Sequence, residues 1–234
     1  MAKNLTTIGF DADDTLWQNE EFFRLTEARF HDLLKDYADP DDLARRLLEA
    51  ECRNLGHYGF GIKGFVLSMI ETAIEVTDKR VPASVISELI EAGQDMLQHP
   101  IHLLPGAEDT VTALAGRFRL VLITKGDLLD QERKLAQSGL GELFDAVEIV
   151  SDKVPQTYMR AFMRHGDGPE RAMMVGNSMK SDVVPAIEAG GWGVHVPARY
   201  EWEIEKADAP VDHPRFRVIE SLKTLPDLLS DLGA

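Results

Sequence analysis

The sequence predicts an α/β protein with a parallel sheet flanked by helices and an all-helical region inserted after the first strand. Three observations predict it. A short apolar strand near the start of the chain ends in a cluster of acidic residues. A region of about 80 residues after it shows only helical periodicity, and strand and helix patterns alternate through the rest. Such alternation is typical of right-handed βαβ units and hence of a parallel sheet.

The first strand, predicted over 5–10, is apolar and runs into Asp11-Ala12-Asp13-Asp14-Thr15. The last residues of a strand in an open α/β fold point into the crevice where ligands bind. Carboxylates gathered there repel one another unless a cation or a shared proton relieves them. A nucleophilic carboxylate with a proton donor two residues later suits phosphoryl transfer around Mg²⁺. An Asp-rich turn with a helix cap is the alternative.

The helical region begins directly after this acidic turn. Asp39 is a predicted N-cap, and Pro40 is predicted to take the first helical position after it. Apolar stripes at helical spacing follow, and the region ends before the turn at 103–106. Because it starts beside the acidic turn, we expect it to lie over the site as a lid.

The remaining chain alternates between the two patterns. Strands are predicted over 120–124, 146–150, 172–176, 193–196 and 216–219, and helices over 127–138, 155–165, 182–189 and 221–232. The segment 197–214 is polar and contains proline, which predicts a surface loop.

Composition narrows the possible partners. The net charge of −15 argues against nucleic acid and against anionic membrane surfaces, while a small phosphorylated substrate stays possible. The single cysteine, Cys52, fits a reducing compartment. The first residues lack the apolar core of a signal peptide, and no run approaches the ~18 apolar residues of a membrane span. We therefore expect a soluble, cytoplasmic protein.

Three further groups follow predicted strands. Thr124 ends the second strand, Lys153 follows the third, and Gly176-Asn177-Ser178-Met179-Lys180-Ser181-Asp182 follows the fourth. A hydroxyl and exposed amides can bind a phosphoryl oxygen, a lysine can neutralise it, and oxygen side chains can ligate Mg²⁺. A helix cap for Thr124 and a solvated side chain for Lys153 are the alternatives.

The order and spacing of these groups, together with the insert, resemble the haloacid dehalogenase (HAD) superfamily over about 5–196. The segments 11–16 and 176–182 look like its first and fourth motifs, and Thr124 and Lys153 look like its second and third. The resemblance implies a Rossmann-like core of residues 1–16 and 100–234 and a helical C1 cap of residues 17–99. Most members of the superfamily are magnesium-dependent phosphohydrolases.

The resemblance also implies roles for individual residues. Asp11 would attack phosphorus and form an aspartyl phosphate, and Asp13 would protonate the leaving alcohol and then activate water. Thr124 and Lys153 would hold the phosphoryl oxygens. Asp14 is expected to be a turn or helix-cap group.

Magnesium would be held by the Asp11 carboxylate, the Asp13 backbone carbonyl and the loop from Asn177 to Asp182. Many family members carry aspartate where this chain has Asn177. An amide oxygen can ligate Mg²⁺ but brings no charge, so we expect Asp182 to contribute more of the metal binding. Which of the two is the direct ligand stays open.

Substrate contacts are expected from backbone amides around Ala12, Lys125 and Gly126. In the cap, the glycine-rich segment 54–64 holds Lys63, a candidate for contacting the leaving group or a second anionic group. An ordinary interhelical connection is an equal alternative.

The leading hypothesis is a magnesium-dependent phosphomonoester hydrolase that acts on a small phosphorylated metabolite through an aspartyl phosphate. Asp13 favours it, because family dehalogenases generally lack an acid at that position. The alternatives are a phosphomutase on the same scaffold and a non-catalytic metabolite-binding protein. The substrate and the oligomeric state do not follow from the sequence.

Overall fold

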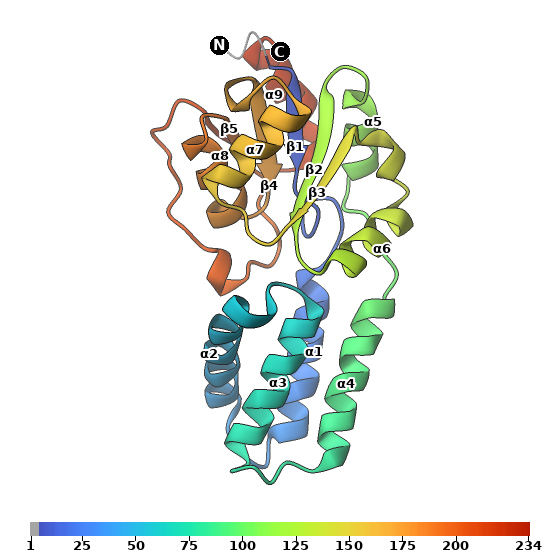
Figure 1. Cartoon of the computed structure of the whole chain (residues 1–234), viewed down its shortest axis with the longest axis vertical. Coiled ribbons are helices and arrows are strands. Elements are labelled where there is room, and N and C mark those ends of the chain that lie inside the picture. Colours follow the sequence, from blue (N-terminus) through green and yellow to red (C-terminus); the bar gives the residue numbers. More distant parts are fainter. Residues whose placement is uncertain (1–4) are drawn as a thin grey trace. The chain divides into compact units, whose positions relative to one another are not determined.

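The structure, a computed structural model, describes residues 5–234 (Figure 1). Met1–Asn4, on which the expectation of no signal peptide partly rests, lie outside the described residues. The chain divides into two compact units. The sheet unit comprises residues 5–20, Ile101–Lys125 and Gln131–Ala234, and the helical unit comprises Glu21–Pro100 and Gly126–Asp130.

A six-stranded sheet, with all neighbouring strands parallel, forms the centre of the sheet unit and confirms the predicted α/β class. Its strand order is β3-β2-β1-β4-β5-β6. The strands are β1 (Thr7–Phe10), β2 (Arg119–Lys125), β3 (Ala146–Val150), β4 (Ala172–Gly176), β5 (Trp192–His195) and β6 (Phe216–Val218).

Successive strand residues point to opposite faces of the sheet. Both faces of this sheet are apolar, and helices cover each of them. Phe10 and Leu122 pack in a cluster with α5 and α9, whereas Val121 and Ile123 pack in another with α7. The α-helices of this unit are α5 (Ala107–Leu114), α6 (Leu128–Ser138), α7 (Pro155–His165), α8 (Val184–Glu188) and α9 (Leu225–Leu232). The short turns are η1 (Gly141–Leu143), η2 (Pro169–Arg171), η3 (Met179–Val183), η4 (Glu203–Glu205) and η5 (Leu222–Thr224).

Four helices make up Glu21–Pro100 almost entirely. They are α1 (Glu20–Leu34), α2 (Pro40–Tyr58), α3 (Ile62–Val76) and α4 (Ala83–Gln98). Their apolar stripes meet in one cluster that includes Phe30, Leu43 and Met69. As predicted, Asp39 is the N-cap of α2: its side chain accepts a hydrogen bond from the Asp42 amide, and a proline follows it.

The structure differs from the sequence expectations in several places, among them the last helix, predicted from 221, where η5 precedes α9 and α9 begins at Leu225. Helix α5 was not predicted. Of the helix predicted over 182–189, the structure has α8 over Val184–Glu188, and a π-helical turn, η3, precedes it from Met179. Trp17, assigned from the sequence to the inserted region, is fully buried in the core of the sheet unit. Among the described residues, no helix has both the length and the apolar character needed to span a bilayer.

Candidate active site

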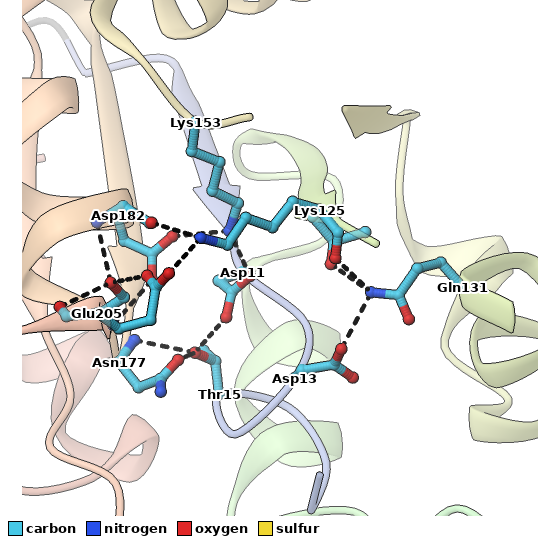
Figure 2. Close-up of polar contacts among 12 residues, drawn as sticks. Asp11, Asp13, Thr15, Lys125, Gln131, Lys153, Asn177, Asp182 and Glu205 are labelled. Carbon is cyan, nitrogen blue, oxygen red and sulfur yellow. Dashed lines mark hydrogen bonds and ion pairs between the residues drawn. The ribbon is translucent and has the colours of Figure 1, made fainter. Parts of the chain in front are cut away.

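The site lies at the carboxyl ends of neighbouring parallel strands. Phe10 of β1 is in register with Leu122 of β2 on one side and with Val175 of β4 on the other. The residues that follow these strands therefore emerge at one edge of the sheet, as the rule for open α/β sheets requires. Figure 2 shows the side chains that meet there.

Lys153 joins two carboxylates at the centre of the site. Its Nζ donates to Asp11 Oδ1 and, at 2.7 Å, to Asp182 Oδ1. All three residues are buried. Burial and the nearby Asp182 raise the pKa of Asp11 to about 7, against the lowering effect of Lys153. Burial alone would lower the pKa of Lys153, but the two carboxylates outweigh it and raise the value. Lys153 therefore stays charged and compensates two buried anions.

The Asn177 side chain lies beside the other oxygen of Asp11. Its amide is 3.1 Å from Asp11 Oδ2 and 3.1 Å from the backbone oxygen of Asp13. The amide can take two orientations. With its nitrogen toward this pair, it donates a hydrogen bond to both oxygens. With its oxygen toward the pair, three oxygens lie close together, and a cation is needed between them. A carboxylate, a backbone carbonyl and an amide oxygen are ligands that Mg²⁺ prefers, so the residues present fit the metal implied by the resemblance.

The turn after β4 positions Asp182. Ser178 is the N-cap of η3: its Oγ accepts from the Ser181 amide at 2.9 Å. The Ser178 amide in turn donates to Asp182 Oδ2 at 2.9 Å. A Cβ atom at Gly176 would collide with the Asp182 carboxylate, so glycine is the residue that leaves room for it. Both oxygens of Asp182 are thus engaged within the sheet unit.

Asp13 points away from Asp11 toward α6 (Figure 2). Its carboxylate accepts from Trp17 Nε1 at 2.7 Å, from Lys134 Nζ at 3.0 Å and from Gln131 Nε2 at 3.1 Å. Three donors around one carboxylate fix its orientation. To protonate a leaving group, Asp13 has to exchange some of these contacts for the substrate and a proton.

Asp14, in contrast, has a structural role in this arrangement. Its carboxylate accepts from the amides of Asn19 and Glu20 at the start of α1, at 2.9–3.1 Å. The residue has a φ of 58°, which Asp tolerates better than most residues. Burial and the nearby Asp13 raise its pKa to about 6.

Thr124, of the second motif, and the neighbouring Lys125 are held by partners that could not be identified from the sequence. Thr124 Oγ1 is buried and accepts from Gln131 Nε2 at 2.6 Å. Lys125 Nζ donates to Ser181 Oγ at 2.7 Å and to Glu205 Oε1 at 2.5 Å. The hydroxyl and the ammonium group are therefore fixed on opposite sides of the strand end.

The remaining predicted substrate residues have backbone roles or, for Lys63, an ion pair within the helical unit. The Ala12 carbonyl accepts from the Leu16 amide at 2.8 Å and so closes the acidic turn. Gly126 has a φ of 143°, which favours glycine. Lys63 belongs to the helical unit, where its Nζ forms an ion pair with Asp127 Oδ2 at 2.8 Å.

Four contributors to the site were missed in the sequence: Trp17, Gln131, Lys134 and Glu205. Gln131 and Lys134 are three residues apart on α6, so they share one helix face, and this spacing was a usable signal. Glu205 lies in the segment predicted as a surface loop, where no periodicity indicates burial. Its side chain is nevertheless only 12% exposed.

Comparisons with known proteins agree with the motifs. A family model described as a haloacid dehalogenase-like hydrolase matches residues 5–190. Glyceraldehyde 3-phosphate phosphatase of Methanothermobacter thermautotrophicus is 26% identical over 237 residues, covering 96% of this chain and 100% of that protein. A haloacid dehalogenase-like family hydrolase from Xanthomonas campestris is 42% identical, with a TM-score of 0.87, over 98% of this chain and 92% of that chain. A 2-haloacid dehalogenase from Pseudomonas syringae pv. tomato shares the fold at 22% identity and a TM-score of 0.62, over 97% and 99% of the two chains.

Proposed function

Since this chain belongs to the haloacid dehalogenase-like hydrolases, we propose that it is a magnesium-dependent phosphomonoester hydrolase working through an aspartyl phosphate on Asp11. The observation that carries the proposal is the arrangement around Asp11. One of its carboxylate oxygens is paired with the buried Lys153, and the other lies 3.1 Å from the Asn177 amide, which is also 3.1 Å from the Asp13 carbonyl oxygen.

Asp11 is the proposed nucleophile because it is buried, fixed and directed to the strand edge. A carboxylate oxygen of Asp11 forms a bond to phosphorus while the bond from phosphorus to the leaving oxygen breaks. Lys153 compensates the charge of the carboxylate and of the phosphoryl group. Thr15 Oγ lies 3.1 Å from Asp11 Oδ2 and helps to fix the carboxylate orientation.

Asp13 is the proposed acid and base. It gives a proton to the leaving oxygen in the first step and takes one from water in the second, when water attacks phosphorus and releases Asp11. A leaving alkoxide needs this proton, whereas a leaving halide does not. The presence of Asp13 therefore favours phosphate-ester hydrolysis over the dehalogenation named for the Pseudomonas syringae protein of the same fold.

Magnesium, when bound, would neutralise the phosphoryl oxygens and the nucleophile. Asp11, the Asp13 carbonyl and Asn177 would hold it. We assign the direct fourth-motif contact to Asn177, because both Asp182 oxygens are already engaged by Lys153 and the Ser178 amide. Asp182 would then act by its charge and by holding Lys153.

The substrate class follows from the same features. The curated relative is a phosphatase of a three-carbon aldehyde phosphate, and the helical unit is inserted where a C1 cap would enclose a small molecule. We therefore propose a small phosphorylated metabolite as the substrate and a cap role for the helical unit. The acidic chain, at −15, does not favour a polyanionic substrate.

The test is hydrolysis of para-nitrophenyl phosphate with Mg²⁺, with EDTA, and by the Asp11→Asn variant. We expect turnover that requires Mg²⁺ and that falls by at least ~10³-fold in Asp11→Asn, since the nucleophile is lost. Asp109→Asn, an exposed position on α5, is the matched control and should keep wild-type activity.

Turnover that persists in EDTA, or in Asp11→Asn above the background rate, would refute the mechanism. No turnover of any phosphate ester, combined with tight binding of a phosphate-mimicking fluoride complex, would favour the metabolite-binding alternative. A requirement for a 1,6-bisphosphate activator would indicate a phosphomutase.

A further inference from the structure

Glu205 is a nearly buried carboxylate that the proposed chemistry does not use. It ends the short turn η4, and its side chain is 12% exposed. Oε1 lies 2.5 Å from Lys125 Nζ, and Oε2 lies 2.5 Å from Ser178 Oγ. The segment around η4 is thus fastened to the ends of β2 and β4 through one acidic side chain.

The contacts of Glu205 continue toward the proposed catalytic groups. Ser178 caps η3, and its amide binds Asp182. Asp182 in turn pairs with Lys153. On the other side, Lys125 Nζ also donates to Ser181 Oγ in the same turn, at 2.7 Å. Figure 2 shows Glu205 beside Asp182, with the Lys125 side chain reaching toward them from the end of β2.

The charge of Glu205 needs an explanation, because a buried carboxylate beside a phosphate site repels the substrate. Burial by itself would raise its pKa. The charge of Lys125 and hydrogen bonds from Lys125, Ser178 and Ser181 outweigh burial, so the pKa is lowered and the carboxylate is ionised at neutral pH. Its negative charge is therefore matched to the Lys125 ammonium.

We propose that Glu205 is a positioning residue for the proposed phosphoryl transfer, which it serves by holding the Lys125 ammonium and the Ser178 turn in place. The inference rests on the proposed function. Without the Glu205 carboxylate, the Lys125 ammonium group is free to move toward the phosphate-binding position. Phosphate then binds more tightly in the ground state, while the transition state gains nothing.

The test compares Glu205→Gln with Glu203→Gln, a matched control on the same turn. Glu203 is 64% exposed and pairs with Lys206 at the surface. We expect Glu205→Gln to lower kcat for para-nitrophenyl phosphate about tenfold and to tighten the Kd of inorganic phosphate, measured by calorimetry, about threefold. Glu203→Gln should change both by less than about twofold.

A double-mutant cycle with Lys125→Met separates positioning from general support of the loop. If Glu205 acts through Lys125, then Glu205→Gln should change phosphate Kd by less than about twofold once the ammonium is gone. Phosphate binding that weakens together with kcat, or an equal effect in both backgrounds, would overturn the proposal.

Two further readouts keep the result decisive. If Glu205→Gln does not fold, Glu205→Asp is the second variant, because it retains the charge. Its phosphate affinity should equal that of the wild-type protein, while its kcat should fall. Tighter phosphate binding by Glu205→Asp would contradict the charge argument. If the wild-type protein shows no turnover, the proposed function fails. The phosphate titrations of Glu205→Gln in the two backgrounds then decide on Glu205 alone.

Discussion

Replacing Lys153 by methionine should strongly destabilise the metal-free protein. Methionine keeps most of the apolar stem and removes only the ammonium group. That group is the buried cation that joins Asp11 and Asp182, with 2.7 Å between Nζ and Asp182 Oδ1. Its loss leaves two carboxylates buried beside each other without a compensating charge.

The size of the effect follows from this geometry. Unit charges about 4 Å apart interact by about 4 kcal/mol at an effective dielectric constant of about 20. Breaking a buried pair by removing one partner typically costs about 3–5 kcal/mol. We expect the free energy of unfolding to fall by about that amount at about pH 7.5. For a chain of 234 residues this corresponds to a Tm lower by about 6–10 °C.

The loss should shrink as the pH is lowered. The folded-state pKa of Asp11 is raised to about 7, so the folded protein binds a proton that the unfolded chain releases. Stability is therefore lost as the pH rises from the ordinary aspartate value to about 7. Removing Lys153 raises the Asp11 pKa further. At about pH 5.5 the protonated carboxyl group should make the variant closer in stability to the wild-type protein.

Urea denaturation in EDTA, monitored by tryptophan fluorescence, measures the free energy of unfolding of both proteins at the two pH values. All three tryptophans, Trp17, Trp192 and Trp202, belong to the sheet unit, so the signal reports on the unit that contains Lys153. Lys223→Met, at an exposed position of the same unit, is the control. A loss below about 1 kcal/mol, or one as large at low pH as at neutral pH, would refute the reasoning.

Two other substitutions test the turns that hold the site. Asp14→Asn should keep the positive φ and remove the ionisable group. Folding raises the pKa of Asp14 from 3.8 to about 6, so the free energy of unfolding of the wild-type protein falls between about pH 4 and 6. In urea titrations the variant should lack roughly 3 kcal/mol of that fall. An equal pH dependence of the two proteins would contradict the assigned pKa. Gly176→Ala places a Cβ within 2.7 Å of Asp182 Cβ and should lower the free energy of unfolding by about 1–3 kcal/mol. Gly56→Ala on α2 meets no atom within 4 Å and should be neutral or stabilising, so equal effects of the two alanines would argue against the collision.

The parts of the fold predicted well from the sequence are those with a strong local signal. The strands at 146–150 and 172–176 and the helix at 155–165 have the predicted bounds, because each is a clean periodic run between turn residues. The π-helical turn η3 was missed, because nothing in the pattern distinguishes it from the first turn of an α-helix. The unpredicted α5 is only eight residues long and follows directly on a turn.

The site divides in the same way. Asp11, Lys153 and Asp182 follow strands, and parallel strands bring such residues to one edge, so their meeting was predictable. Contacts such as that of Glu205 depend on how an irregular segment folds back on the sheet, and no local pattern encodes that. Trp17 is a smaller case: it follows the acidic turn at once, but its indole packs in the sheet core rather than in the helices.

The central place of β1 has a consequence for synthesis on the ribosome. Thr7 pairs with Arg119 on one side and with Ala172 on the other, so β1 is synthesised well before either of its partner strands. The four helices of residues 21–100 are complete long before then and have a hydrophobic cluster of their own. Contacts between residues so far apart in sequence form late and slowly. The nascent chain therefore orders its inserted helices first, and one edge of the apolar strand Thr7–Phe10 stays without its partner until β4 has been made.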